Sequence, residues 1–197
     1  MPEPEPRIFV IGFNRCGTTS LNRFFEKHGI PAVHWDGNAL ARSVAAQVAK
    51  GADPVGEYPD ARAFSDMESV HDRHHRLVEG YRYFKEMFEW HPTSYFILNT
   101  RPVEDWLKSR ARIGNGNYLE HYARHYGYAD TAPVLARWRL EWHRHHADVL
   151  SFFADKPRSL LVYDIVSHDP AALATFLAPA FVVDPAKFPH HAKGAPP

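Results

Sequence analysis

The chain has 197 residues, of which 45% are hydrophobic and 23% are charged. These values are ordinary for a soluble globular protein, and the length suits a single domain with a sizeable core. The 23 basic and 23 acidic side chains give a formal charge of zero, which argues against a broad nucleic-acid-binding surface but allows a local basic cleft. The single cysteine, Cys16, excludes an internal disulfide and fits a reducing compartment.

The N-terminal residues do not have the pattern of a targeting signal. Residues 1–6 combine prolines with glutamates, so we expect a flexible segment that is neither a signal peptide nor a transit peptide. No apolar run reaches the ~20 residues that a membrane-spanning helix needs, and we predict a cytoplasmic protein without a membrane span. Residues 188–197 form a polar tail. The composition does not indicate an oligomeric state.

The N-terminal pattern is a strand, a glycine loop and a helix. Residues 8–11 are an apolar run typical of a buried strand, and a loop bounded by Gly12 and Gly17 follows. A helix with an apolar face then continues to Gly29. Free N–H groups at the start of such a helix converge on an oxyanion, and the helix dipole adds about half a positive charge there. This segment therefore predicts an anion-binding site.

Strands and helices alternate through the rest of the chain. We predict further strands at residues 30–35, 63–66, 95–101 and 159–164. We predict further helices at residues 38–51, about 71–91, 102–110, 118–126, 133–152 and 170–177. This order implies right-handed crossovers and an α/β fold of three layers, in which helices flank a mainly parallel sheet.

Ligands of such sheets lie beyond the carboxyl ends of the strands. In our prediction five residues with suitable chemistry occupy strand ends: Gly12, Asp36, Asp66, Arg101 and Asp164. We expect the functional site at this edge.

The glycine loop differs from two common phosphate-binding loops. A nucleotide-hydrolysing P-loop has lysine directly after its second glycine, where this chain has Thr18. The nearest cation, Arg15, instead comes two residues before Gly17. A Cys-x5-Arg phosphatase loop starting at Cys16 needs arginine at position 22, which is Asn22 here. Cys16 is therefore interpreted as a small loop residue.

The segment Arg-Cys-Gly-Thr-Thr at residues 15–19 resembles the phosphosulfate-binding loop of sulfotransferases that use 3′-phosphoadenylyl sulfate (PAPS). Residues 98–110 are similar to the family's 3′-phosphate motif, in which an arginine closes a strand and a serine follows eight positions later. Arg101 and Ser109 match both residues and spacing, and a guanidinium beside a hydroxyl suits a terminal phosphate. Residues 64–66, 161–164 and 188–190 resemble stretches of a bacterial branch, so the resemblance runs from Arg7 to about Lys193.

Three features depart from the family pattern. Arg15 replaces the usual lysine. Ser20 stands where many cytosolic members have a tryptophan that stacks on adenine. The arginine-lysine-glycine clamp of cytosolic members has only a weak counterpart, Lys193-Gly194.

The resemblance implies a single-domain P-loop fold over residues 1–197 that transfers a sulfuryl group from PAPS to a hydroxyl of a carbohydrate or small metabolite. It implies that residues 14–20 bind the 5′-phosphosulfate, with Arg15 at the leaving oxygen, and that Arg101 and Ser109 bind the 3′-phosphate. The residues of this loop are Asn14, Arg15, Cys16, Gly17, Thr18, Thr19 and Ser20. Two alternatives stay open: a nucleotide or small-molecule kinase, and a non-catalytic nucleotide-binding module of the same fold.

Related sulfotransferases use a glutamate or histidine as general base, often from the segment beyond the first helix. If the second strand continues through Asp36, its period of two places His34 and Asp36 on one face and turns Trp35 into the packing. Asp36 is the first candidate for the base, His34 is the second, and Asp66 is the reserve.

Two further expectations concern metal and acceptor. The histidines at positions 71, 74 and 75 and at 143, 145 and 146 lack a known ligand spacing, so we predict solvated helix faces and no metal site. Residues 51–62, residues 114–128 and the tail from Phe188 are the predicted walls of the acceptor site, because binding variation concentrates in loops.

Overall fold

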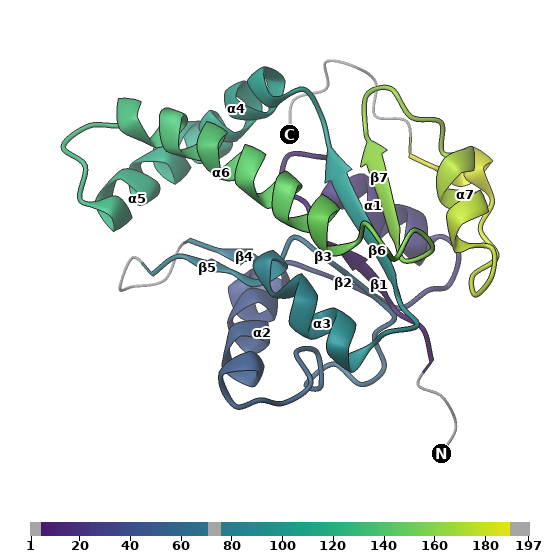
Figure 1. Ribbon diagram of the computed structural model, residues 1–197. Coiled ribbons are helices and arrows are strands. Elements are labelled where there is room, and N and C mark those ends of the chain that lie inside the picture. Colours follow the sequence, from purple (N-terminus) through teal and green to yellow (C-terminus); the bar gives the residue numbers. More distant parts are fainter. Residues whose placement is uncertain (1–4, 71–75, 190–197) are drawn as a thin grey trace.

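A computed structural model describes residues 5–70 and 76–189, and its centre is a five-stranded parallel sheet in the order β2-β3-β1-β6-β7 (Figure 1). The strands of this sheet are β1 Ile8–Val10, β2 Ala32–His34, β3 Ala63–Ser65, β6 Tyr95–Thr100 and β7 Leu160–Asp164. A separate antiparallel hairpin pairs β4 Glu68–Ser69 with β5 Val78–Glu79.

Helices cover both faces of the sheet. The α-helices are α1 Thr18–Glu26, α2 Ala39–Ala49, α3 Phe84–Trp90, α4 Val103–Ala111, α5 Asn117–Tyr126, α6 Ala132–Phe152 and α7 Ala171–Leu177. Short 3₁₀ segments lie at η1 Asp36–Asn38, η2 Gly80–Tyr83, η3 Ile113–Gly116 and η4 Pro185–Lys187. Helices α1 and α7 pack on one face, and α3 and α6 cross the other (Figure 1). The predicted three-layer α/β fold is confirmed.

The central strand shows why this arrangement forms. Ile8 and Val10 belong to the buried cluster that contains the apolar residues of α1 and α7, whereas Phe9 and Ile11 belong to the larger cluster on the opposite face. Successive side chains of a strand point to opposite faces, so a continuous apolar run fills both cores. This explains why residues 8–11 contain no polar residue.

The helix predicted at residues 71–91 is wrong at residues 76–83, which form no α-helix. Residues 71–75, with three of the clustered histidines, lie outside the described residues, and residues 78–79 form β5. Helix α3 starts only at Phe84. A Cβ on Gly80 would lie 3.1 Å from the carbonyl oxygen of Met67 and 3.3 Å from the Cα of Ala41, so the hairpin passes close to α2 here. The apolar spacing was compatible with a hairpin that leads into a shorter helix.

At the N-terminus, Glu5 and Pro6 contact Arg62, whose Nη2 donates to the Pro6 carbonyl at 2.8 Å. Phe188, at the start of the predicted tail, packs on Phe24. The rest of the predicted flexible segment and of the tail, including Lys193-Gly194, lies outside the described residues. Across residues 5–70 and 76–189, no helix is long and apolar enough to cross a membrane.

Candidate functional site

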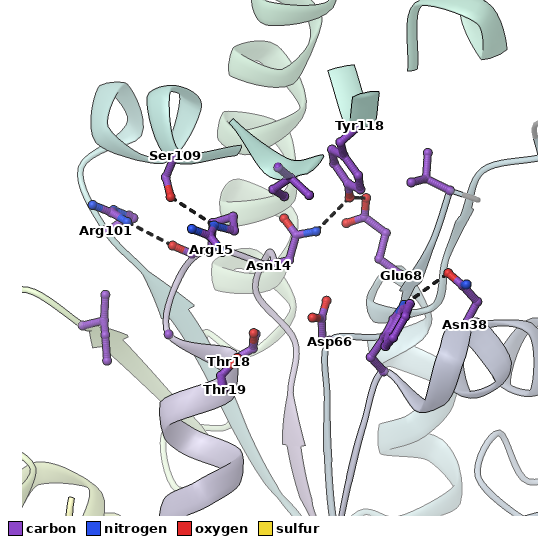
Figure 2. A pocket seen from close by; sticks show the side chains of 15 residues that line it. Asn14, Arg15, Thr18, Thr19, Asn38, Asp66, Glu68, Arg101, Ser109 and Tyr118 are labelled. Carbon is purple, nitrogen blue, oxygen red and sulfur yellow. Dashed lines mark hydrogen bonds between the residues drawn. The ribbon is translucent and has the colours of Figure 1, made fainter. Parts of the chain in front are cut away.

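A cavity of about 610 Å³ opens at the carboxyl ends of the strands (Figure 2). Its walls come from the β1–α1 loop (residues 11–17), the start of α1, the segments after β2 and β3, and residues of α4 and α5. Asp66 and Arg101 line it, as predicted from their places at strand ends. Gly12, Asp36 and Asp164 are not among its lining residues. Of the loops predicted to form the acceptor site, residues 114–128 contribute Tyr118 to the cavity lining. Residues 51–62 contribute no lining residue.

Asn99, a fully buried residue of β6, holds the β1–α1 loop in shape. Its Oδ1 accepts a hydrogen bond from the Gly12 N–H at 2.8 Å, and its Nδ2 donates to the carbonyls of Phe13 and Cys16, both at 3.1 Å. A Cβ on Gly12 would lie 2.1 Å from the Asn99 carbonyl oxygen, so only glycine fits. Asn99 was not among the predicted site residues, although an amide inside an otherwise apolar strand indicates that it bonds a neighbouring segment.

We expect Asn99→Ala to destabilise the protein, because each buried polar group left without a partner costs about 1–3 kcal/mol. The urea midpoint should fall clearly. Asn22→Ala is the matched control: Asn22 is also a buried asparagine, but its Oδ1 has no partner within the described chain. Equal midpoints for the two variants would contradict the anchoring role of Asn99.

The start of α1 has features that favour an anion. Gly17 has φ +81°, and a Cβ there would lie 2.5 Å from the Ile165 side chain, so the backbone turns tightly into the helix. The Leu21 N–H donates to the Gly17 carbonyl at 3.0 Å, which leaves the preceding amides of the first turn without intrahelical partners. The side chains of Thr18 and Thr19 line the cavity beside these amides. Amides, hydroxyls and the helix dipole together favour an oxyanion.

Cys16 and Ser20 are buried and are not among the cavity-lining residues, so their side chains do not face this space. Burial raises the pKa of the Cys16 thiol to about 12, which keeps it protonated at neutral pH. A predicted binding role for these two residues rests on their backbone amides alone.

Two arginines and a serine gather at one end of the cavity (Figure 2). Arg15 has φ +61°, and its Nε donates to the Ser109 hydroxyl at 3.1 Å. Arg101 Nη1 donates to the Arg15 carbonyl at 3.2 Å, while its Nε is buried and has no partner among the described residues. The structure therefore brings together three residues predicted from two separate sequence motifs.

Asp66 lies on the cavity wall away from these arginines, directly after β3 (Figure 2). It has φ +56°, a conformation that is uncommon outside glycine and tends to occur at functional sites. Burial and the nearby charge of Glu68 raise the pKa of Asp66 to about 7, against the opposing effects of Arg110 and Arg15. A carboxyl group with a pKa near neutrality can exchange a proton under physiological conditions.

His34 lies next to Asp66, with 3.7 Å between its Nε2 and Asp66 Oδ2. Its Nδ1 is 2.9 Å from the Ser65 hydroxyl, and its Nε2 is 3.4 Å from the Thr19 hydroxyl. Burial lowers the pKa of His34, so the ring is neutral at neutral pH and the contact with Asp66 is not an ion pair. His34 is not among the cavity-lining residues.

The predicted continuation of the second strand through Asp36 is wrong. β2 ends at His34, because Trp35 and Asp36 adopt left-handed backbone angles, with φ +60° and +48°. Asp36 is exposed, accepts a hydrogen bond from the Tyr58 hydroxyl at 2.9 Å, and is not among the cavity-lining residues. Trp35 does not enter the packing: it is 43% exposed and lines the cavity, and its Nε1 donates to Asn38 Oδ1 at 3.2 Å.

A buried polar network joins the cavity wall to the β1–α1 loop. Glu68 Oε1 accepts hydrogen bonds from Arg110 Nη2 at 2.7 Å and from the hydroxyls of Tyr118 and Tyr122. Arg110 Nη1 donates to Asn14 Oδ1 at 3.1 Å, and Asn14 Nδ2 donates to the Tyr118 hydroxyl at 2.8 Å. Neither Glu68 nor Arg110 was among the predicted site residues. The Arg110 guanidinium also lies near aromatic rings, at 4.7 Å from that of Trp138.

The solvated histidine face predicted on the long helix is wrong at two positions. His145 is buried in α6 and its Nε2 is 2.7 Å from the Ile11 carbonyl, while His146 Nε2 is 2.9 Å from the Thr100 hydroxyl. Burial lowers the pKa of both imidazoles to about 4, so both are neutral. Within the described part of the chain, no group of three or more histidine, cysteine, aspartate or glutamate side chains is placed to hold a metal ion.

A family model described as a sulfotransferase domain matches residues 7–155, from the start of β1 to beyond the end of α6. The chain belongs to this sulfotransferase family. The match includes the β1–α1 loop, Asp66 and the Arg101–Ser109 pair, so the residues around the cavity lie within the family domain, apart from Ile165. Membership of this family supports the conclusion that the chain is a transferase. A comparison with curated proteins finds no match.

Proposed function

We propose that this sulfotransferase-domain protein transfers a sulfuryl group from PAPS to a hydroxyl of a carbohydrate or small metabolite. The observation that carries the proposal is that the two ends of one cavity differ in their chemistry. An anion-binding loop and two arginines lie at one end, and Asp66, with a pKa of about 7, lies on the wall away from them. Transfer to a hydroxyl needs both ends, because a multiply charged donor must be held while the acceptor loses a proton.

The residues present fit PAPS. The amides at the start of α1, with Thr18 and Thr19, suit the 5′-phosphosulfate. Arg101 and Ser109 suit the 3′-phosphate, and the buried Arg101 Nε that lacks a partner in the described chain is a donor available for it. Arg15, beside Ser109, is placed to offset negative charge on the donor.

PAPS supplies a sulfuryl group on a bridging phosphate oxygen, and that oxygen keeps the electron pair when the 3′,5′-bisphosphate leaves. The acceptor oxygen forms the new bond to sulfur as the old bond breaks. Arg15 stabilises the negative charge that develops on the bridging oxygen, an electrostatic contribution that is usually the largest in such reactions. The Asp66 carboxylate takes the acceptor's proton, a task that suits a base with a pKa near the working pH.

The first test is the choice of nucleotide. We expect adenosine 3′,5′-bisphosphate to raise the melting temperature, since a ligand at 100 times its dissociation constant adds about 2.7 kcal/mol to stability. ADP, which lacks the 3′-phosphate, should stabilise distinctly less, and Arg101→Ala should remove the difference. Equal shifts for the two nucleotides in the wild-type protein would remove Arg101 and Ser109 from the binding site.

The second test is transfer itself, measured with sulfur-labelled PAPS and a panel of hydroxylated acceptors. Label on an acceptor supports the proposal. Bisphosphate binding without transfer to any acceptor indicates a non-catalytic nucleotide-binding module. A clear preference for ATP with magnesium over PAPS indicates a kinase, which would share the loop.

A further inference from the structure

Glu68 has one carboxylate oxygen without a hydrogen-bond partner among the described residues. Its side chain is 2% exposed and lines the cavity. Oε1 is the oxygen that accepts the hydrogen bonds from Arg110, Tyr118 and Tyr122. Oε2 is buried and has no hydrogen-bond partner among the described residues. A buried oxygen left in this way costs free energy, so a hydrogen-bond donor is expected there when the site is filled.

The position of Glu68 indicates that the acceptor substrate supplies the hydrogen-bond donor for Oε2. Glu68 comes two residues after Asp66, and its charge contributes to the raised pKa of Asp66, which places the two carboxyl groups near one another. Figure 2 shows both on the side of the cavity away from Arg101 and Ser109. The free oxygen of Glu68 therefore belongs to the region where the acceptor hydroxyl meets its base, and not to the region of the donor nucleotide.

We propose that Glu68 Oε2 accepts a hydrogen bond from a second hydroxyl of the acceptor, next to the hydroxyl that is sulfated, so that the preferred substrate is a vicinal diol. This inference rests on the proposed sulfotransferase reaction and names the chemical class of its acceptor. Glu68 acts in it as a binding residue, and Asp66 remains the base.

The charges favour a hydroxyl over other donors. A carboxylate oxygen only accepts hydrogen bonds, so an anionic group without a proton is excluded. Arg110 already neutralises Glu68 in a buried ion pair with 2.7 Å between Nη2 and Oε1, so an ammonium group finds less unbalanced negative charge. The half-exposed Trp35 indole lines the same cavity and offers an apolar surface for the carbon skeleton of the diol.

The decisive experiment compares matched acceptors on the wild-type enzyme with PAPS. The pairs are cyclohexane-1,2-diol with cyclohexanol, and catechol with phenol. We expect kcat/KM to be about 10–100-fold higher for the diol in at least one pair, the range that one hydrogen bond to a charged group supports. Equal kcat/KM within every pair, or transfer to none of the diols by a protein that binds the bisphosphate, would overturn the inference.

Glu68→Gln links this preference to the residue. The glutamine retains one oxygen for the Arg110 side but presents an N–H₂ group in place of Oε2. This group can offer a diol hydroxyl only a neutral hydrogen bond, so the diol preference should fall by about fivefold. If the unpaired Arg110 prevents folding, Glu68→Gln combined with Arg110→Met removes both buried charges. Glu89→Gln, an exposed carboxylate of α3, is the matched control and should keep the preference. A folded Glu68 variant that retains the full preference would overturn the inference, and if neither variant folds the acceptor pairs decide alone.

Bisphosphate binding separates this inference from the proposed function. If adenosine 3′,5′-bisphosphate fails to stabilise the wild-type protein, the proposed reaction fails. If the bisphosphate binds and monohydroxy acceptors are sulfated as well as diols, the reaction stands and the role of Glu68 fails.

Discussion

Asp66→Asn is expected to lower turnover by about 10²–10⁴-fold, the usual contribution of a general base. Asparagine has nearly the same shape as aspartate but cannot accept the acceptor's proton. The substitution leaves the donor-binding residues in place, so 3′,5′-bisphosphate should still raise the melting temperature by about the wild-type amount. Turnover with saturating PAPS and calorimetric titration with the bisphosphate measure the two effects separately.

The pH dependence gives a second readout of the same group. The base must be the carboxylate, and the pKa of Asp66 is about 7, so kcat/KM should rise with pH and level off above that value. One unit below the pKa, about a tenth of the enzyme carries the ionised base. Asp66→Asn should remove this dependence from the residual activity. A wild-type profile that stays flat from pH 5 to 9 would contradict the assignment.

The two candidates that the sequence favoured provide the comparison. Asp36→Asn should change turnover little, because Asp36 bonds Tyr58 and is not among the cavity-lining residues. His34→Ala should have an intermediate effect, since His34 contacts Asp66 and the Thr19 hydroxyl without lining the cavity. If Asp36→Asn abolishes transfer while Asp66→Asn does not, the original sequence prediction is right and the structural assignment of the base is wrong.

The fold and the grouping of Arg15, Arg101 and Ser109 at one end of the cavity were predictable because their signals are local. The apolar run at residues 8–11 is typical of a strand buried on both faces, and the glycines after it permit the tight turn into a helix. Arg101 and Ser109 lie eight positions apart on one strand and the helix that follows it. Each of these predictions depends on neighbours within about a dozen residues.

The other end of the site depends on backbone angles and on distant partners. Trp35 and Asp36 both adopt left-handed backbone angles, and the residue types at those positions do not by themselves predict such angles. Glu68 and Arg110 are separated by 42 positions, and Asn99 lies 87 positions from the glycine that it holds. Periodicity carries no information on such pairs. The base was therefore predicted one strand away from the carboxylate that lines the cavity.

Arg15→Ala is expected to lower turnover by about 10²–10³-fold, as the loss of a single transition-state donor typically does. Arg15→Lys is the matched control and should retain much of the activity, because the amine keeps the positive charge and lysine is usual at this position in the related sulfotransferases. The measurement is kcat with saturating PAPS, beside bisphosphate affinity by calorimetry. Near-normal turnover of Arg15→Ala under saturating PAPS would show that the bridging-oxygen role is wrong.

The contact between Arg15 and Ser109 makes the affinity measurement informative. Arg15 Nε donates to the hydroxyl that we assign to the 3′-phosphate, so Arg15 could instead serve the nucleotide's ground state. In that case Arg15→Ala would weaken bisphosphate binding as strongly as Arg101→Ala, and kcat would recover at high PAPS. A group that acts on the bridging oxygen gains its interaction as charge develops, so its loss lowers kcat and leaves product affinity less affected. We therefore expect Arg15→Ala to cause a large fall mainly in kcat and Arg101→Ala to cause a large fall mainly in bisphosphate affinity.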